Sequence, residues 1–247
     1  MYDRLFCRLY NEFGWNEYPL ALSEQLIRWL ELNRVSVRSA LDLGCGTGVL
    51  CQQLYAHGIE TVGMDLSPDM IAIARERAPE LRFEVADMTR FQTDRIFDLV
   101  TCTGDAINHI EPISSVERVF SNVYDALAPG GLFIFDLLDE GEIPLGEPFE
   151  ADAEDGLRVR IGADMDDTGR VTLRIEGRES DVLRFSETIV ERLYDPGQIL
   201  SRLESAGFSV LQCSNALIQG ENTGTTWFVV AQKAKSENNT KASEDSL

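Results

Sequence analysis

The sequence predicts an α/β fold built on a doubly wound parallel sheet. Two observations carry this prediction. Apolar strand-like runs alternate with helix-like runs as far as residue 137, and the first strand leads into a glycine-rich turn and then a helix. Strands that alternate with helices of this length favour a parallel sheet with helices on both faces. With 247 residues, of which 44% are hydrophobic, the chain can bury a sizeable core.

The N-terminal segment, residues 2–33, is expected to be helical and to act as a lid ahead of the sheet. Apolar and aromatic residues recur at helical spacing from Leu5 to Phe13 and again from Leu22 to Leu30. The run Gly14-Trp15-Asn16 separates the two stretches, so we expect two helices over residues 1–33.

The core elements follow in a regular order. We expect strands over 40–43, 61–65, 82–86, 97–102 and 132–136, and helices over 49–56, 69–78 and about 115–127. Ser67 can cap the second of these helices, and Pro68 suits its first position. The run Pro129-Gly130-Gly131 predicts a turn ahead of the strand at 132.

Beyond residue 139 the pattern changes to short alternating runs, which predict an antiparallel β insertion or cap over about 147–194. The core then resumes with a helix over 198–206 and strands over 208–212 and 226–231. We therefore expect a single domain over 1–234. Residues 235–247 are polar with almost no apolar residue, and we expect them to be disordered.

Composition narrows the function. The formal net charge of −20 disfavours DNA or RNA as a partner, because such a chain repels phosphate backbones. No run of 18 apolar residues predicts a membrane span, and no signal-peptide core is visible near Met1. The five cysteines are scattered without a CxxC pair, which argues against a zinc site and for a cytoplasmic location, and no other metal cluster is visible.

The octapeptide Leu-Asp-Leu-Gly-Cys-Gly-Thr-Gly at 41–48 is the most informative stretch of the chain. Its glycines let a ligand approach bare backbone, and the helix behind the turn presents unpaired N–H groups. A phosphate-binding loop would need a Lys after the glycines, and a dinucleotide site would read GxGxxG; neither is present. Asp42, just before the turn, favours a ligand that carries an amino group.

Open α/β sheets bind ligands at the carboxyl ends of their strands. Asp65 ends the second predicted strand, where its carboxylate could accept both hydroxyls of a ribose. Asp87 follows the third strand and could meet the exocyclic amine of adenine. Polar residues follow the fourth strand, through residue 109.

Taken in order and spacing, these motifs resemble those of the class I S-adenosylmethionine (SAM)-dependent methyltransferases. The resemblance covers residues 2–137 strongly and 182–232 more loosely. Tyr10 resembles the Tyr that covers SAM in the small-molecule branch of that family, which includes the sugar N-methyltransferases. The resemblance implies a Rossmann-like sheet of seven strands with the last antiparallel, and a β insertion after the fifth strand that roofs the substrate pocket.

The resemblance also implies roles for individual residues. SAM is the implied cofactor, and its implied contacts are Tyr10, Asp42, Gly44, Cys45, Gly46, Gly48, Asp65, Leu66, Met70, Asp87, Met88, Cys102 and Thr103. The polar groups best placed to help the acceptor are Asp105, Asn108 and His109. Trp15, Tyr18 and Arg192 are candidates for the substrate side of the pocket.

The sequence therefore predicts a SAM-dependent methyltransferase that modifies N or O of a small soluble molecule, without nucleic acid or membrane partners. Two alternatives stay open: a SAM-binding regulatory or partner protein without turnover, and an NAD-type oxidoreductase on the same topology. The identity of the acceptor is not fixed by any motif, and the sequence allows a homodimer.

Overall fold

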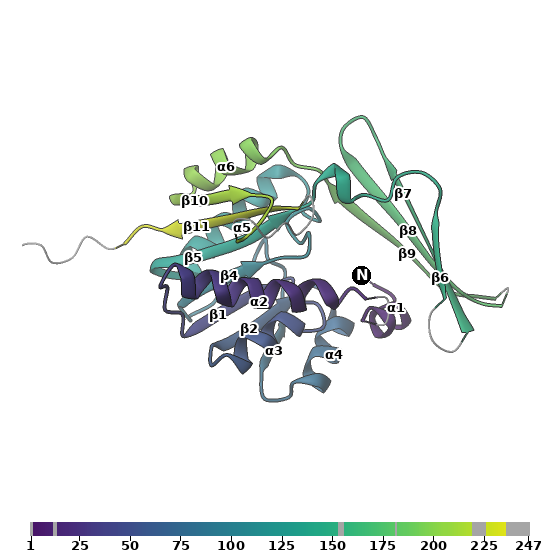
Figure 1. Ribbon diagram of the computed structural model, residues 1–247, viewed down its shortest axis with the longest axis horizontal. Helices are drawn as coiled ribbons and strands as arrows, with labels where there is room; N and C mark the ends of the chain where they lie inside the picture. Colours follow the sequence, from purple (N-terminus) through teal and green to yellow (C-terminus); the bar gives the residue numbers. More distant parts are fainter. Residues whose placement is uncertain (1, 12–13, 153–155, 181, 219–225, 236–247) are drawn as a thin grey trace, which may run out of the picture.

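The computed structural model describes residues 2–11, 14–152, 156–180, 182–218 and 226–235, and it contains two separate β-sheets (Figure 1). Apart from residue 235, the predicted disordered tail lies outside the described residues. No helix within the described ranges is long and apolar enough to cross a bilayer.

The larger sheet has seven strands in the order β10-β11-β5-β4-β1-β2-β3. Its members are β1 (Ser39–Leu43), β2 (Glu60–Asp65), β3 (Arg82–Val85), β4 (Phe97–Cys102), β5 (Leu127–Leu137), β10 (Phe208–Ser214) and β11 (Trp227–Lys233). Neighbours among β1 to β5 pair in parallel, whereas β11 is antiparallel to both β5 and β10. The predicted seven-stranded sheet with an antiparallel last strand is confirmed. The strand order reverses between β1 and β4, where folds of this type bind ligands.

Helices cover both faces of this sheet. The helices α2 (Glu17–Leu32) and α3 (Val49–Ala56) share one apolar cluster with one face, and α4 (Pro68–Arg77) packs beside α3. On the other face lie α5 (Ile113–Ala126) and α6 (Pro196–Ser205). The buried positions of α5, such as Val116, Val119, Phe120 and Val123, follow the i, i+3, i+4, i+7 spacing of an amphipathic helix.

The fifth strand is longer than the sequence predicts. Leu127 already pairs with Phe97, and the next pair is Leu132 with Leu99. Residues 128–131 are therefore accommodated opposite a single residue of β4, as an irregularity inside the strand rather than a turn before it. Gly130 adopts a φ of +81°, which a glycine tolerates without strain.

The predicted insertion after β5 is present as an antiparallel sheet, β6-β7-β8-β9. Its strands are β6 (Phe149–Asp152), β7 (Leu157–Met165), β8 (Arg170–Glu179) and β9 (Val182–Arg192), preceded by the short 3₁₀ helix η1 (Glu140–Glu142). The alternation of the sequence did not predict β6. The apolar face of the insertion packs on α1 (Arg4–Leu9), where Phe185 of β9 meets Phe6. Figure 1 shows this sheet projecting beyond the larger one, with α1 against it.

Candidate active site

The glycine turn joins β1 to α3 at the carboxyl edge of the sheet. Gly44, Gly46 and Gly48 all have positive φ, of +72°, +52° and +77°. They serve different purposes. A Cβ on Gly48 would come within 2.7 Å of the Phe83 ring, so Gly48 permits close packing and does not face a cavity. A Cβ on Gly46 would meet nothing within 4 Å, so the backbone there borders open space.

Asp65, at the end of β2, is fixed by the backbone on both sides. Its carboxylate accepts hydrogen bonds from the N–H groups of Gly46 at 2.9 Å and Ser67 at 2.8 Å. Burial raises its pKa, and these two backbone donors work against that rise. Asp87, after β3, holds Thr89 and the Arg90 guanidinium with its two oxygens.

Two adjoining cavities run along the turn. The larger, of about 490 Å³, lies over the ends of β2 and β3, and the smaller, of about 80 Å³, lies over the ends of β1 and β4. The predicted SAM residues that line the larger one are Tyr10, Gly44, Gly46, Asp65, Leu66, Met70, Asp87 and Met88. Those that line the smaller one are Tyr10, Asp42, Gly44, Cys45, Gly46 and Thr103. Neither lining includes a Lys or Arg among the described residues, so both cavities favour a cation.

Asp42 lies beneath the turn with only 3% of its surface exposed. Its carboxyl group accepts hydrogen bonds from the Thr101 hydroxyl at 2.7 Å and the Cys51 thiol at 3.4 Å. Burial raises its pKa to about 7, against the opposing effect of these donors. A carboxylate this deeply buried would be stabilised by a ligand's positive charge in the smaller cavity above it.

Tyr10 closes the space over the turn from the end of α1. It is the aromatic residue that lines both cavities, and its ring packs on Trp15 at 4.9 Å between centroids. Phe6 contacts both rings. The predicted substrate residue Trp15 therefore lies in the aromatic cluster of the lid and does not itself line a described cavity.

The loop after β4 is held by Asp136, a fully buried residue at the end of β5. Asp136 accepts the N–H groups of Gly104 at 2.9 Å and Asp105 at 3.0 Å, and also the hydroxyl of Tyr18. Tyr18 lines the smaller cavity. Burial and the nearby charge of Asp136 raise the pKa of Asp105 well above its usual value. Cys102, one residue before this loop, is fully buried in the apolar core.

Asn108 and Arg192 are also absent from the linings of both cavities. Asn108 is fully buried; its amide donates to the Arg192 carbonyl at 2.7 Å and accepts the Leu138 N–H at 3.0 Å. The Arg192 guanidinium bonds instead to the hydroxyl of Thr168. Both polar atoms of the Asn108 amide are hydrogen-bonded to backbone. We therefore assign Asn108 a structural role, which is to connect the insertion to the core, and no catalytic role.

His109 lies at the wall of the larger cavity, facing β9 of the insertion. Desolvation lowers its pKa below the usual value. Its Nε2 is 3.6 Å from a carboxylate oxygen of Glu191, a buried residue of β9 whose pKa burial raises to about 7. The insertion thus supplies an acid to the same site as the β4 loop.

Sequence reasoning did not select Glu191 or Asp136. Asp136 ends a core strand, so the rule that selected Asp65 could also have found it. In β9 the residues Phe185, Glu187 and Glu191 are buried, whereas the even-numbered residues of the strand are exposed or half-buried. That alternation places Glu191 on the same inward face as Phe185. It is visible in the sequence and could have indicated that Glu191 points inward.

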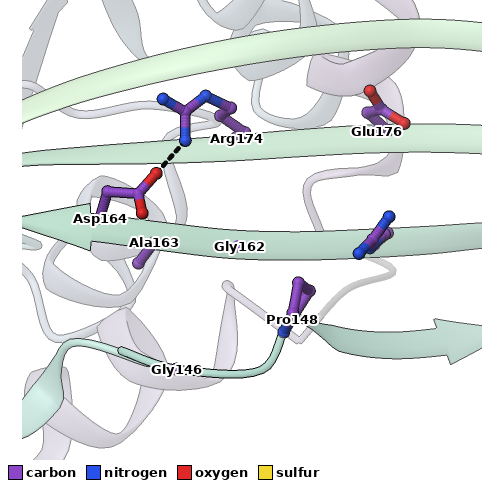
Figure 2. A pocket seen from close by; sticks show the side chains of 8 residues that line it. Gly146, Pro148, Gly162, Ala163, Asp164, Arg174 and Glu176 are labelled. Atoms are coloured by element: carbon purple, nitrogen blue, oxygen red, sulfur yellow. Dashed lines mark hydrogen bonds and ion pairs between the residues drawn. The ribbon is translucent and has the colours of Figure 1, made fainter.

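A third cavity, of about 230 Å³, lies away from the glycine turn, on the solvent-exposed face of the insertion (Figure 2). Its charged lining residues come from β7 and β8, and Arg174 forms an ion pair with Asp164 across them. It contains none of the predicted site residues. Because each of its charged residues is already engaged in an ion pair, we place the candidate site at the two cavities along the glycine turn.

Comparisons with known proteins show what this chain is similar to. Residues 40–131, which include the glycine turn, Asp65 and Asp87, match the family model described as a methyltransferase domain. A relative from Geobacillus sp. (strain WCH70), named as a methyltransferase, is 32% identical over 140 residues, which are 55% of this chain and 54% of the relative. The chain therefore spans about half the length of that curated relative.

A longer match is to the dTDP-4-amino-2,3,4,6-tetradeoxy-D-glucose N,N-dimethyltransferase of Saccharopolyspora spinosa. It is 27% identical over 194 residues, 74% of this chain and 76% of the relative. Among solved structures, the SAM-bound amino pentose methyltransferase CalS10 from Micromonospora echinaspora superposes with a TM-score of 0.72 at 23% identity, covering 95% of this chain and 98% of the other. That likeness extends over both sheets.

Proposed function

We propose that this chain is a SAM-dependent enzyme that methylates a nitrogen of a small soluble molecule. Its residues 40–131 match a methyltransferase domain. The observation that carries the proposal is the pair of cavities along the glycine turn, with Asp65 and Asp87 in the wall of one and Asp42 beneath the other. A ligand with a nucleoside at one end and a cation at the other suits this arrangement.

The residues present fit SAM. The open backbone at Gly46 gives a chain-like ligand room to lie against the turn, and Asp65 is held where a ribose could donate to it. The smaller cavity ends on Asp42, whose buried carboxyl suits an ammonium group. The donor brings a positive charge, and the cavity linings without Lys or Arg favour it electrostatically.

When bound, SAM supplies a methyl group on a positively charged sulfur, which is a good leaving group. The protein's share is to align the acceptor and exclude water. The aromatic cluster around Tyr10 closes the cavities from the lid side. His109, which is held largely neutral by its lowered pKa, can receive a proton that the acceptor loses.

Nitrogen is favoured over oxygen by two observations. Relatives of this chain include N,N-dimethyltransferases, such as the Saccharopolyspora spinosa enzyme and one from Streptomyces fradiae that is 35% identical over 97 residues. In addition, Glu191 lies 3.6 Å from His109, which lines the larger cavity, and a carboxylate at that place suits an acceptor that is itself a cation before reaction. The relatives lend no support to a NAD-type oxidoreductase or to a regulator without turnover.

Isothermal titration with SAM and with S-adenosylhomocysteine tests the donor assignment. We expect dissociation constants in the micromolar range, and no binding below about millimolar would contradict it. A panel of paired acceptors, each amine matched with the corresponding alcohol, then tests the reaction. We expect methyl transfer to amines only; SAM binding without transfer to any acceptor would favour the regulatory alternative.

We also place the enzyme in the cytoplasm, because all five cysteines are free thiols and four of them are buried. A homodimer is compatible with the sequence and is tested by light scattering of the purified chain.

A further inference from the structure

Glu191 is a buried acid to which no described residue donates a hydrogen bond. It lies near the end of β9 with 8% of its surface exposed. Its ion-pair partner among the described residues is His109, whose Nε2 is 3.6 Å from a Glu191 oxygen, which is longer than a hydrogen bond. A largely buried carboxylate without a hydrogen-bond partner in the chain is costly unless a group from outside reaches it, and 11% of the Glu191 side chain is exposed, so we expect such a group to complete it.

Glu187 shows what an ordinary buried acid on this strand looks like. It lies four residues earlier on the same inward face and is 9% exposed. Unlike Glu191, it accepts the backbone N–H of Asp3 and so fixes the start of α1. Burial alone therefore does not distinguish Glu191; the missing partner does.

The groups that face Glu191 come from the lid and from the loop after β4. Tyr2 and Tyr10 both line the larger cavity, and the charge of Glu191 contributes to raising the pKa of each. His109 lines the same cavity. Asp105 is also near: burial, the charge of Asp136 and the charge of Glu191 all raise the pKa of Asp105. No cationic side chain of the described residues reaches this group other than the His109 ring. A positive charge that neutralises Glu191 is therefore expected from the side of His109, the neighbour of Glu191 that lines the larger cavity.

We propose that Glu191 binds the protonated amine of the methyl acceptor and takes its proton, which makes Glu191 a catalytic residue for N-methylation. The proposal rests on the proposed methyltransferase function and goes beyond it, because it fixes the ionic state of the acceptor and the base. An ammonium has no lone pair and cannot attack a methyl group, so an acceptor that binds as its ammonium must first give its proton to a base in the site.

The step balances as follows. The acceptor ammonium transfers one proton to a carboxylate oxygen of Glu191, which leaves a lone pair on nitrogen. That lone pair forms the new N–C bond while the C–S bond of the donor breaks and its electron pair stays on sulfur. The proton on Glu191 passes through His109, whose side chain is 31% exposed against 11% for Glu191, and leaves to solvent.

Sinefungin provides a probe that needs no knowledge of the acceptor. It carries an amine in place of the transferable methyl of SAM, whereas S-adenosylhomocysteine carries neither. The ratio of the two affinities, measured by isothermal titration at pH 7, therefore reports how the site receives an ammonium group. We expect the wild-type chain to bind sinefungin more tightly, and Glu191→Gln to lose about tenfold of that preference while keeping its affinity for S-adenosylhomocysteine.

Glu187→Gln is the matched control, because it makes the same change on the same face of β9 at an acid that already has a partner. We expect it to keep the wild-type preference. Thermal unfolding of both variants verifies that they fold. An unchanged preference in Glu191→Gln, or a wild-type chain that binds S-adenosylhomocysteine but shows no preference for sinefungin, would overturn the assignment of Glu191. Binding of neither compound by the wild-type chain would instead overturn the proposed function itself.

Discussion

The carboxylate of Asp65 accepts the backbone N–H of Gly46 at 2.9 Å, so the end of β2 braces the turn that follows β1. The second oxygen of Asp65 accepts the N–H of Ser67 at the start of α4. One side chain thus fixes two backbone segments at the wall of the larger cavity. Its remaining lone pairs are available to a ligand, since a carboxylate can accept about four hydrogen bonds.

Replacing Asp65 tests both of its roles, which are to hold the backbone and to bind the ligand. We expect Asp65→Ala to reduce affinity for S-adenosylhomocysteine by about a hundredfold or more, because two charge-assisted hydrogen bonds to the ribose are lost at roughly 1.5–3 kcal/mol each. The same change removes the brace on Gly46 and lowers the free energy of unfolding. Isothermal titration and urea denaturation measure the two effects separately.

Asp98→Ala is the matched control for Asp65→Ala. Asp98 also accepts two backbone N–H groups, those of Arg38 at 2.8 Å and Ser39 at 3.1 Å, but at the opposite edge of the sheet. We expect it to lower the free energy of unfolding without changing the affinity for S-adenosylhomocysteine. A similar loss of affinity in both variants would mean that Asp65 acts on the ligand only through stability.

Asp42 predicts a specific pH dependence. Its pKa in the folded chain is about 7, above the usual 3.8, so the folded state holds a proton that the unfolded state releases. Its contribution therefore lowers stability as pH rises from about 4 to about 7, by up to roughly 4 kcal/mol. We expect ligand-free wild type to lose stability relative to Asp42→Asn across this window. If the curves of unfolding free energy against pH were parallel for wild type and Asp42→Asn, they would contradict a raised pKa of the Asp42 carboxyl.

The core elements of this fold were predictable because their signals are local. The helix over 49–56 follows the glycine turn directly, and α3 has the predicted bounds. Ser67 and Pro68 likewise predict the start of α4, and the Ser67 hydroxyl accepts a hydrogen bond from the Met70 N–H. The run Pro129-Gly130-Gly131 predicted a turn before the strand, and this was wrong. Pairing with β4 on both sides of the run includes these residues in β5. Pairing across a sheet is not visible in one segment.

The less predictable parts of the site depend on contacts between distant residues. Asn108 looked like a polar group free to act, but the Arg192 carbonyl that occupies it lies 84 positions along the chain. Glu191 looked like one acid among 42 Asp and Glu residues, and only its missing partner sets it apart. A single sequence shows which atoms can bond, whereas the fold decides which of them are already engaged.

Asn108 is expected to behave as a structural residue. Asn108→Ala leaves the Leu138 N–H and the Arg192 carbonyl without partners in a buried setting, at about 1–3 kcal/mol for each group. We expect a lower free energy of unfolding and faster hydrogen exchange at the end of β9. Affinity for S-adenosylhomocysteine should stay unchanged. Full stability with lost turnover would point instead to a direct part in catalysis.

Tyr18 is expected to stabilise the loop after β4 through Asp136. Removing its hydroxyl in Tyr18→Phe leaves the buried Asp136 carboxylate with one donor fewer, for which we expect a loss of about 1.5–3 kcal/mol in the free energy of unfolding. Urea denaturation measures it. Tyr55→Phe is the control, because Tyr55 is 46% exposed, and we expect a change within about 0.5 kcal/mol. Equal effects of both changes would show that the Asp136 contact contributes nothing.

His109 separates donor binding from turnover. Its ring lines the larger cavity beside Glu191 and donates to no part of the glycine turn or Asp65. We therefore expect His109→Ala to bind SAM within about twofold of wild type but to lower kcat for an amine acceptor by roughly a hundredfold, the usual scale of a lost proton-transfer group. His57→Ala, at the exposed end of α3, should leave both unchanged. If His109→Ala lost SAM binding as fully as Asp65→Ala, His109 would belong to the donor site, since a group that handles only the acceptor's proton cannot affect a donor bound alone.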